Sequence, residues 1–364
     1  MSELRVIIAG GGTGGHLFPA LAIGDELKSC GTDVMYMGST YGIEAKHLMD
    51  RNENCKLLNI RGIQRTFSLA AIGQNLLFPI KFIIGYIQSI ITILEFKPHV
   101  VVGTGGYASG LPMLAALLLK KKTLLQEQNS FPGITTRKLS HKVDTICIAY
   151  ESAQQYLNKT ALLTGNPIRK DLNLIDRNEA CEKLGLNPDK TVIFILGGSQ
   201  GSHPFNVHFT NVYGDYINKD IQLLWQTGNG DIDWLNAEID SPLVKLTPFI
   251  HQMSDAYSAA DIVISRAGAL AIEELKSCGK AMVLIPFPLA AADHQTENAR
   301  SLVIENAAIC ISQTEMYDGS LETTIIELLK NKSKLKSLKE NAKRLSFPNA
   351  LTEISNQIME LAHA

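Results

Sequence analysis

The stretch Leu4–His16, LRVIIAGGGTGGH, decides the fold. A short apolar run ends in a turn made almost entirely of glycine, and helix-forming sequence follows. Glycine lets the backbone adopt positive φ and approach a ligand closely. A helix that starts at such a turn offers unpaired N–H groups and the positive end of its dipole. Strand, glycine turn and helix in this order are typical of the first unit of a Rossmann-like sheet.

Short runs rich in Val and Ile alternate with longer helix-like stretches along the whole chain. The first series of predicted strands is Leu4–Gly10, Val34–Gly38, Lys56–Ile60, His99–Gly103, Thr123–Gln126, Asp144–Ile148 and Ala161–Thr164. The second series is Thr191–Gly197, Gln222–Gln226, Leu243–Phe249, Asp261–Ser265, Ala281–Ile285 and Ala308–Ile311. Continuous apolar strands separated by helices indicate parallel sheets covered on both faces. For 364 residues we therefore predict an α/β protein with two Rossmann-like, doubly wound domains and a ligand cleft between them.

The predicted division between the domains falls at Thr164–Arg169, where a glycine and an Asn-Pro pair break helical structure. Near the end of the chain, Ser346-Phe347-Pro348 interrupts the helical pattern again. Beyond it, Leu351, Ile354, Ile358 and Leu361 recur at helical spacing. We expect residues 1–164 together with a C-terminal helix 349–364 to form the N-terminal domain, and 165–348 to form the second.

Composition excludes some classes of protein. The formal net charge is -2, whereas a nucleic-acid-binding protein usually carries a strong basic excess. The six cysteines are scattered singly, which indicates reduced thiols. The sequence MSELRVIIAGGG leads directly into the first strand without a signal-peptide pattern, so we expect a protein of the cytoplasm.

The segment Leu76–Phe96 is long enough to cross a bilayer, which takes about 20 residues. Its polar residues share one side of a predicted helix, and they are Gln74, Lys81, Gln88, Thr92 and Glu95. Lys81 in hydrocarbon would cost about 2.5–3.5 kcal/mol, and the strand His99–Gly103 should join the same sheet as Leu4–Gly10. We therefore predict that the segment does not cross. It is then either a deeply buried helix or an exposed apolar patch that docks on a membrane surface.

Further glycine-rich turns follow predicted strands at Gly103–Tyr107, Gly197–Gly201 and Arg266–Leu270. Such turns lie at the carboxyl ends of parallel strands, where open α/β sheets bind ligands. Gly10, Gly12 and Gly15 also match G-x-G-x-x-G, which raises the possibility of a dinucleotide site. That site needs an acidic residue at the end of the second strand, and Tyr36–Ser39 contains none, which argues against an NAD-dependent dehydrogenase.

Two acidic sites have a functional and a structural interpretation. Glu274 lies on the helix that opens after Gly268, where it is placed to accept hydrogen bonds from a ribose, although an isolated Glu is more often a surface residue. Asp231-Ile232-Asp233 matches the D-x-D pattern of some metal-dependent glycosyltransferases. It follows a glycine-containing turn and starts a predicted helix, where Asp is favoured for capping, so we interpret it as structural.

Together, these motifs resemble the MurG family, the UDP-N-acetylglucosamine:N-acetylmuramyl-(pentapeptide) pyrophosphoryl-undecaprenol N-acetylglucosamine transferases of bacterial cell-wall synthesis. The resemblance covers nearly the whole chain. Each motif is weak alone, but all six in this order are highly specific. They are Gly11–His16, Gly105–Tyr107, Glu127–Asn129, Gly165–Arg169, Gly197–Gly201 and Arg266–Leu270.

The resemblance implies the two-domain fold called GT-B, without a catalytic metal or cofactor. It implies inverting transfer of GlcNAc from UDP-GlcNAc to the 4-hydroxyl of the muramyl sugar of lipid I (undecaprenyl-pyrophosphoryl-MurNAc-pentapeptide), which forms lipid II. It also implies a peripheral protein at the cytoplasmic face of the inner membrane. Other wall-synthesis proteins are expected partners, and nucleic acid is not.

Carried over residue by residue, the resemblance assigns roles to individual side chains. Ser199 and Arg169 should contact the diphosphate, Ile250 should meet uracil through its backbone, and Glu274 should hold the ribose. Gln295 and Asn129 should read the sugar hydroxyls. The turn of Thr13, Gly14 and Gly15 should face the transferred sugar and the acceptor pyrophosphate. The rest of the implied donor site is Gln200, Ala269, Leu270, Ala271, Ile272 and Glu273.

The family's membrane patch maps onto Leu76, Ile80, Ile83 and Tyr86, which favours docking over burial for the apolar helix. Four such side chains entering an apolar phase would contribute on the order of 5–8 kcal/mol.

The chain departs from the family's usual pattern at four positions. Gln126 stands where His is common, Ala271 and Glu273 replace Thr and Ser, and Ser202 replaces Ala. The loss of the Thr hydroxyl removes one possible contact to the donor, so we expect an effect on donor affinity rather than on the reaction.

An inverting displacement needs a base for the acceptor hydroxyl, and two residues are candidates. His16 lies at a helix N-terminus, where the dipole disfavours the imidazolium, although it is also a plausible turn residue. Glu127, after the fifth strand, is the second. The sequence does not choose between them.

Two rival functions fit parts of the pattern. Another GT-B enzyme, such as a UDP-GlcNAc 2-epimerase, shares the architecture, because one fold hosts many functions. A non-catalytic UDP-sugar-binding scaffold would share the donor site. The apolar helix argues against the first, and the presence of both His16 and Glu127 argues against the second.

Overall fold

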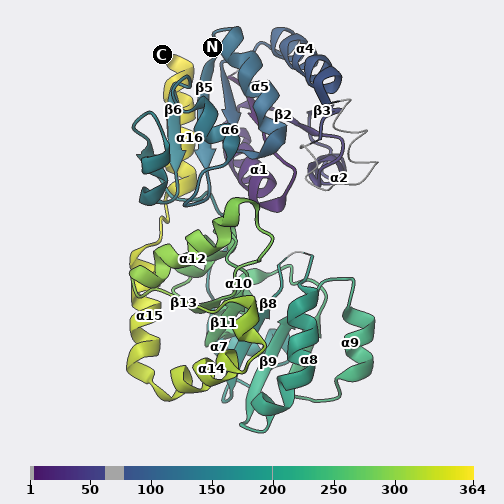
Figure 1. Cartoon of the computed structure of the whole chain (residues 1–364), viewed down its shortest axis with the longest axis vertical. Helices are drawn as coiled ribbons and strands as arrows, with labels where there is room; N and C mark the ends of the chain where they lie inside the picture. The colour runs from purple at the N-terminus through teal and green to yellow at the C-terminus, as the bar shows by residue number, and fades with distance from the viewer. Residues whose placement is uncertain (1–3, 62–77, 199) are drawn as a thin grey trace. The chain divides into compact units, whose positions relative to one another are not determined.

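The computed structural model describes residues 4–61, 78–198 and 200–364, and its chain divides into two compact units. Unit 1 comprises Met1–Ile168 and Phe347–Ala364, and unit 2 comprises Arg169–Ser346. Each unit is one parallel sheet with helices on both faces (Figure 1). The two predicted doubly wound parallel sheets are confirmed.

Unit 1 contains, within its described residues, a seven-stranded sheet in the order β3-β2-β1-β4-β5-β6-β7. Its strands are β1 (Arg5–Ala9), β2 (Asp33–Ser39), β3 (Cys55–Leu58), β4 (Val100–Gly103), β5 (Lys122–Glu127), β6 (Thr145–Ile148) and β7 (Leu162–Leu163). All pairs are parallel, and in the centre Ile7 pairs with Met35 on one side and Val101 on the other. Successive residues of β1 point to opposite faces, so both faces need a helical cover.

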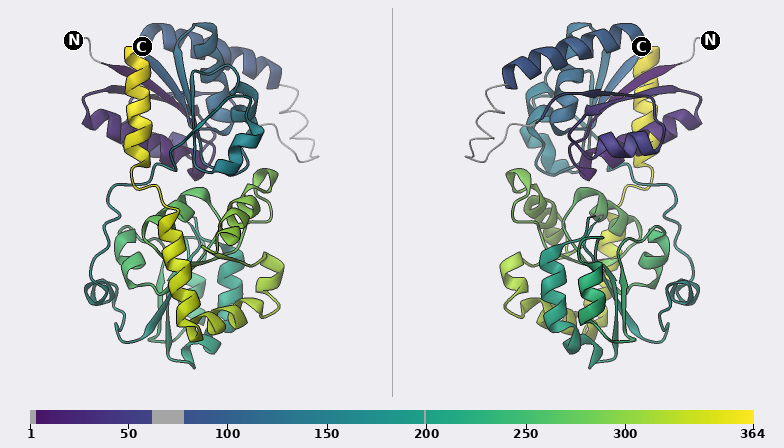
Figure 2. Two further views of the ribbon diagram at one scale, coloured as in Figure 1. Left: turned by 90° about the vertical axis from the view of Figure 1, so that its left-hand side faces the viewer. Right: turned by 90° about the vertical axis from the view of Figure 1, so that its right-hand side faces the viewer.

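The helices of unit 1 supply that cover. They are α1 (Gly14–Ser29), α2 (Glu44–Asp50), α4 (Phe78–Phe96), α5 (Gly106–Leu118), α6 (Ile134–Leu139), the 3-10 helix η1 (Glu151–Tyr156) and α16 (Ala350–His363). Val6 and Ile8 pack beneath α1, α2 and α16, and Ile7 and Ala9 pack beneath α4, α5 and α6. Figure 2 shows α16, the yellow C-terminal helix, lying along the sheet of unit 1. Its Leu351, Ile354 and Ile358 join the same core as α1, so the end of the chain completes the first unit.

Unit 2 contains, among the residues described, a six-stranded parallel sheet in the order β10-β9-β8-β11-β12-β13. Its strands are β8 (Thr191–Leu196), β9 (Ile221–Gln226), β10 (Val244–Thr247), β11 (Ile262–Ser265), β12 (Ala281–Leu284) and β13 (Ile309–Cys310). Every predicted strand of both series has an observed counterpart whose ends differ by at most a few residues, since the apolar runs are short and the glycine turns mark their ends.

Helices also cover both faces of the second sheet. They are α7 (Arg177–Leu184), α8 (His203–Ile217), α9 (Ile232–Glu238), α10 (Met253–Ala259), α11 (Ala269–Ser277), the 3-10 helix η2 (Ala291–Asp293), α12 (His294–Ile304), α13 (Gln313–Met316), α14 (Ser320–Lys330) and α15 (Lys332–Arg344). Val192 and Phe194 face α7, α10 and α11, and Ile193 and Ile195 face α8 and α14.

The strand order places the predicted site turns together within each unit. Each sheet has the Rossmann order, in which strands are first added on one side of the first strand and then, from the fourth strand on, on its other side. In unit 1 the turns after β1 and β4 flank this switch point, and in unit 2 the turns after β8 and β11 do so. Ligands of open α/β sheets bind at this point, so the topology gives each unit one candidate site.

Helix α4 exposes most of its large apolar side chains, and its buried residues, apart from Ile93, are small or polar. Gly85, Ser89 and Thr92 face the core, and a Cβ added at Gly85 would lie 2.8 Å from Leu111. Large apolar side chains between 47% and 58% exposed form the outer face, and they are Ile80, Ile83, Ile84, Ile87, Ile91 and Leu94. The interpretation of a deeply buried helix is therefore wrong.

Helix α4 is long and apolar enough to cross a membrane, and 22% of its most apolar window is buried. The strands on either side of it, β3 and β4, nevertheless belong to one sheet, because β4 pairs with β1 and β3 pairs with β2. The prediction that His99–Gly103 joins the sheet of Leu4–Gly10 is thus confirmed. A helix with both neighbouring strands in one sheet is a crossover on the surface of that sheet.

Candidate active site

The turn after β1 opens α1 and is held from below by a buried acid. Thr13 is extended, with φ -142° and ψ 163°, and Gly14 and Gly15 form the first helical turn. Beneath them, the fully buried Glu44 accepts hydrogen bonds from the N–H of Gly12 (2.7 Å) and of Ser39 (2.8 Å). A Cβ at Gly11, whose φ is +145°, would lie 2.3 Å from this carboxyl carbon, so glycine is required there.

Glu44 is a residue that sequence reasoning missed. An acidic residue in the first turn of a helix is ordinary, because the dipole favours it. The signal that distinguishes Glu44 is the contact with a turn 32 residues earlier in the chain.

His16 lies in the first turn of α1 with its ring against the turn after β4. Its Nδ1 is 3.1 Å from the carbonyl oxygen of Thr104 and 2.9 Å from Oε1 of Gln128. Gly105 has a φ of +94°, and a Cβ there would lie 2.8 Å from Nδ1. The glycines of this turn therefore allow the ring to approach the backbone.

Glu127, the other candidate base, has both carboxylate oxygens occupied. It is 1% exposed, and Oε1 accepts from the N–H (3.1 Å) and Nδ2 (3.3 Å) of Asn129. Oε2 accepts from the N–H of Gly133 (3.0 Å) and from Oγ1 of Thr136 (2.6 Å). These bonds tie the end of β5 to the start of α6. The geometry suits a carboxylate that orders this loop.

The turn after β8 is the candidate phosphate site of unit 2. Gly198 and Gly201 have positive φ, and a Cβ at Gly201 would lie 2.0 Å from the carbonyl oxygen of Thr227. Ser199 lies outside the described residues, and Gln200 is exposed. The N-terminus of α8 follows the turn, so its first N–H groups meet any anion bound there.

Gln226, at the end of β9, braces this turn and was not predicted. Its Nε2 donates to the carbonyl of Gly198 (2.8 Å), and its Oε1 accepts from the N–H of Ile250 (2.9 Å). The backbone N–H of Ile250 is therefore engaged within the protein, so recognition of uracil through this N–H would require Gln226 to move.

Arg266 donates hydrogen bonds to Ser202, which follows the same turn, and to neighbouring elements. Nη2 donates to Oγ of Ser202 (3.0 Å) and Oε1 of Gln313 (2.8 Å), and Nη1 donates to the carbonyls of Ile285 and Pro286. Burial lowers the pKa of Arg266 to about 10. Ser202, where the family usually has Ala, thus gains a hydrogen bond that ties α8 to Arg266.

The helix α11 presents some predicted donor residues and buries others. Its first turn begins at Ala269 after the extended Gly268, with Leu270 and Ala271 half-buried and Ile272 buried. Glu273 is fully buried, and its carboxylate lies 2.9 Å from Nζ of Lys276, which is 3% exposed. Glu273 therefore points into the core.

Arg169 and Glu274, predicted at the diphosphate and the ribose, contact one another. Nε of Arg169 donates to Oε1 of Glu274 at 3.2 Å, and the hydroxyl of the buried Tyr257 donates to Oε2 at 2.8 Å. Burial raises the pKa of Glu274, although Arg169 and the Tyr257 hydrogen bond act in the opposite direction. The carboxylate is thus already oriented by two donors.

Asn129 and Gln295, the predicted sugar-reading residues, belong to different units. Asn129 is oriented by Glu127, as described above, and Oε1 of Gln295 accepts from the N–H of Phe287 at 2.9 Å. Ala292 and Asp293, just before α12, have φ of 53° and 54°, a left-handed conformation that is strained for Ala and less so for Asp. The strain lies beside a predicted site residue.

Asp231 of the D-x-D pair makes hydrogen bonds within unit 2, but not as a helix cap. Asp231 precedes α9, as predicted, yet its Oδ2 accepts from Nδ1 of His203 (2.9 Å) and Nδ2 of Asn206 (2.7 Å), both on α8. Burial raises the pKa of Asp231, but these hydrogen bonds outweigh it and lower the pKa overall. In the part of the chain that the structure describes, no group of three His, Cys, Asp or Glu side chains is arranged to hold a metal ion.

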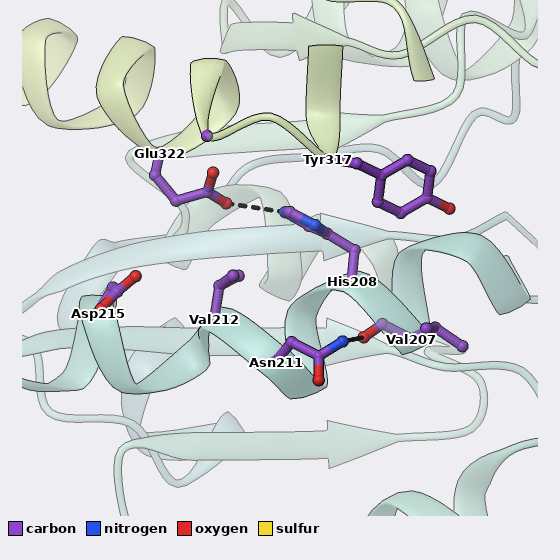
Figure 3. Close-up of a pocket in the computed structure, with 8 residues that line it drawn as sticks. Val207, His208, Asn211, Val212, Asp215, Tyr317 and Glu322 are labelled. Atoms are coloured by element: carbon purple, nitrogen blue, oxygen red, sulfur yellow. Dashed lines mark hydrogen bonds and ion pairs between the residues drawn. The ribbon is translucent and has the colours of Figure 1, made fainter. Parts of the chain in front are cut away.

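A pocket of about 420 Å³ lies elsewhere on unit 2, between α8 and α14 (Figure 3). His208, on α8, faces Glu322 across it, with Nε2 2.8 Å from Oε1. None of the predicted site residues lines this pocket. The contact joins two helices on one face of the sheet.

Comparisons with known proteins match both halves of the chain. Residues 6–148 match the glycosyltransferase family 28 N-terminal domain, and residues 192–354 match its C-terminal domain. A relative from Flavobacterium psychrophilum, a UDP-N-acetylglucosamine--N-acetylmuramyl-(pentapeptide) pyrophosphoryl-undecaprenol N-acetylglucosamine transferase, is 38% identical over 100% of this chain and 99% of its own. The chain belongs to the MurG family. The resemblance drawn from the six motifs is confirmed.

Similarity to solved structures supports membership of the MurG family. The crystal structure of Acinetobacter baumannii MurG is 28% identical, covers 98% of this chain and 99% of its own, and has a TM-score of 0.80. A putative UDP-N-acetylglucosamine 2-epimerase from Listeria monocytogenes has a TM-score of 0.65 at 16% identity, over 97% of this chain and 95% of its own. At that identity, the second likeness shows only the fold.

Proposed function

We propose that this chain is an inverting glycosyltransferase that moves GlcNAc from UDP-GlcNAc to the 4-hydroxyl of the muramyl sugar of lipid I, which gives lipid II. The observation that carries this proposal is the 38% identity, over the full length of the chain, to a transferase whose name gives these substrates. The glycine turns at the switch point of each sheet support it, because they provide one anion site per unit.

Unit 2 is the proposed donor domain. The turn after β8 and the N-terminus of α8 take the diphosphate, and Arg169 adds a cation as negative charge develops on the departing UDP. Glu274 accepts hydrogen bonds from the ribose hydroxyls. Tyr257 orients its carboxylate, and Arg169 would exchange Glu274 for phosphate when the donor binds.

Unit 1 is the proposed acceptor domain, and His16 is the proposed base. The oxygens of Glu127 accept four protein hydrogen bonds, so this carboxylate lacks a free site for the acceptor proton. In contrast, the hydrogen-bond contacts of the His16 ring with Thr104 and Gln128 are both made by Nδ1. Nε2 is the ring nitrogen that takes no part in them. Nε2 would take the proton of the 4-hydroxyl as its oxygen attacks the anomeric carbon and UDP leaves.

Helix α4 is the proposed membrane-docking surface, and in this proposal the enzyme acts on its lipid substrate at the cytoplasmic face of the inner membrane. Of the predicted patch, Ile80 and Ile83 are 57% and 58% exposed, which suits docking. Tyr86 is half-buried against the core and stacks on Phe82, and Leu76 lies outside the described residues. We extend the patch to Ile84, Ile87, Ile91 and Leu94.

The deciding experiment is transfer of radiolabelled GlcNAc from UDP-GlcNAc to a short-chain lipid I analogue, with UDP-GalNAc as the control donor. We expect labelled lipid II with UDP-GlcNAc and little product with UDP-GalNAc. Conversion of UDP-GlcNAc to its 2-epimer without acceptor would instead identify an epimerase. Donor binding without turnover would identify a scaffold, and either result would overturn the proposal.

A further inference from the structure

A chain of amide side chains runs through unit 1 to the ring of His16. Nδ2 of Asn166 donates to the backbone carbonyl of Gln128 (3.0 Å), and Oδ1 of Asn166 accepts from Nε2 of Gln126 (3.2 Å). Oε1 of Gln126 accepts from Nε2 of Gln128, whose own Oε1 faces Nδ1 of His16 at 2.9 Å. Gln126, Gln128 and Asn166 are buried, at 0%, 1% and 0% exposure. Each amide therefore constrains the orientation of the next.

Backbone carbonyls determine the orientation of the Gln128 amide. Its Nε2 donates to the carbonyls of Thr104 (2.8 Å) and Gln126 (3.1 Å). In the flipped orientation, Oε1 would instead face both carbonyl oxygens in a buried site, where repulsion between acceptors and the lost hydrogen bonds disfavour it. The amide oxygen is therefore the end that faces His16.

Two oxygen acceptors consequently face Nδ1 of His16, namely Oε1 of Gln128 and the carbonyl of Thr104. A nitrogen that faces two acceptors must carry the proton, since its lone pair would be repelled by both oxygens. In neutral imidazole only one nitrogen is protonated, so the lone pair is left on Nε2.

We propose that Gln128 is a positioning residue that holds His16 in the Nδ1-protonated tautomer and so keeps Nε2 as the proton acceptor. Asn166 and Gln126 transmit this orientation from the backbone. The partner of Nδ1 is a neutral amide, whereas a carboxylate at the same place would stabilise the imidazolium, so that the ring could accept a proton only at higher pH. This inference deepens the proposed function, because it assumes that His16 accepts the proton of the acceptor hydroxyl.

The other titratable groups of this turn do not contact the ring nitrogen. Glu44 binds the N–H groups of Gly12 and Ser39. Tyr107 packs beside Gly12, and burial raises its pKa, so its phenol stays neutral near pH 7. The partners of Nδ1 are uncharged. The effect of a new charge at position 128 on the ring can therefore be measured without interference from another charge at Nδ1.

The first test is the tautomer of His16 in the full chain, read from two-bond 1H–15N correlation spectra after labelling the histidine nitrogens. The signals of His16 are those lost in His16→Ala. We expect the Nδ1-protonated form in the wild type, and a mixture of both tautomers in Gln128→Met, which has similar length and no amide. An Nε2-protonated ring in the wild type would overturn the inference.

The second test is the pH profile of kcat/KM for transfer. Gln128→Glu places a carboxylate at Nδ1, so the acidic limb should move up by about one pH unit or more, with donor KM within about twofold of wild type. Gln155→Glu, the same substitution on an exposed helix of unit 1, is the control and should leave the profile unchanged. A Gln128→Glu profile superimposable on the wild type would count against the inference.

The two tests separate this inference from the proposed base. The spectra report the tautomer without any turnover. An Nδ1-protonated ring in the wild type that becomes a mixture of tautomers in Gln128→Met supports the role of Gln128, even if His16→Ala turns over normally. That last result would remove His16 from the chemistry and leave its positioning intact. If Gln128→Met fails to fold, the wild-type spectrum and Gln128→Glu still decide.

Discussion

At the scale of single residues, the two candidate bases that the sequence leaves equivalent have different hydrogen-bond partners. Glu127 is buried among four donors, whereas His16 has one nitrogen held by oxygen acceptors. A carboxylate that accepts four protein hydrogen bonds orders the loop around it. A ring held through Nδ1 would leave Nε2 to accept the proton of the substrate, as proposed above.

Replacement of His16 by Ala should lower kcat by at least about 100-fold, because a general base typically contributes 10²–10⁴. Donor binding, measured by calorimetry with UDP-GlcNAc, should be nearly unchanged, since Arg169 and Glu274, the residues proposed to hold the diphosphate and the ribose, belong to unit 2. Near-normal turnover of this variant would exclude His16 as the base. Glu127→Gln should instead lower the free energy of unfolding by about 1–3 kcal/mol, because an amide cannot accept all four bonds.

Donor affinity should depend on the protonation of Glu274. Burial raises the pKa of its carboxyl above the ordinary value, and only the ionised form accepts from both ribose hydroxyls. The KM for UDP-GlcNAc should therefore rise as the pH falls through this raised pKa. Glu274→Gln should have a higher KM throughout and lose this pH dependence. A KM that is flat with pH in the wild type would contradict the ribose role.

At the scale of elements, α11 buries charged residues and α4 exposes large apolar ones. Glu273 of α11 pairs with Lys276 in the core, where sequence alone suggested a donor contact. Helix α4 turns Ile84 and Ile87 outward and Ser89 inward. In both helices the contacts with neighbouring elements, rather than residue type, decide which face is buried.

Removal of one partner of the buried pair in α11 should be costly. Lys276→Met takes away the ammonium that lies 2.9 Å from a fully buried carboxylate, and such a change typically costs about 3–5 kcal/mol. The double variant Glu273→Leu with Lys276→Met should recover most of this loss in denaturant unfolding. A double variant as unstable as the single one would show that the charge is not the cause.

Polar substitutions on α4 should weaken membrane binding without unfolding the chain. Ile84 and Ile87 are 48% and 50% exposed, so their change to Gln should barely alter the melting temperature. Each lost apolar side chain should weaken binding to anionic vesicles by about 1.5–2 kcal/mol. Ile304→Gln, on the 71% exposed Ile304 of α12, is the matched control and should bind as wild type. Equal binding by all variants would exclude α4 as the docking surface.

At the scale of the whole molecule, unit 1 is formed by two separate segments of the chain. The first ends at Ile168, unit 2 follows, and the second segment begins at Phe347 and contains α16. Leu351, Ile354 and Ile358 bury in the core of unit 1, and complete burial of such a side chain is worth about 1.5–3 kcal/mol. The core of unit 1 therefore combines residues of Met1–Ile168 with those of α16.

Deletion of residues 350–364 should destabilise unit 1 by roughly 5 kcal/mol or more and leave unit 2 nearly unaffected. Calorimetry should then separate two transitions, with the lower one assigned to unit 1 by the loss of protection from hydrogen exchange around β1 and α1. Unchanged protection in unit 1 would show that α16 contributes little to its core.

The sequence by itself determined the strands, the glycine turns, the two sheets and the family, because these depend on local runs, spacing and motif order. Only the tertiary structure decided that the Glu127 carboxylate accepts four hydrogen bonds, that Glu44 supports the first turn and that Gln128 faces His16. It also decided that α4 is apolar on its outer side. His16 and Gln128 are 112 residues apart. Hydrogen-bond partners and burial are set when distant segments pack, so no local pattern encodes them.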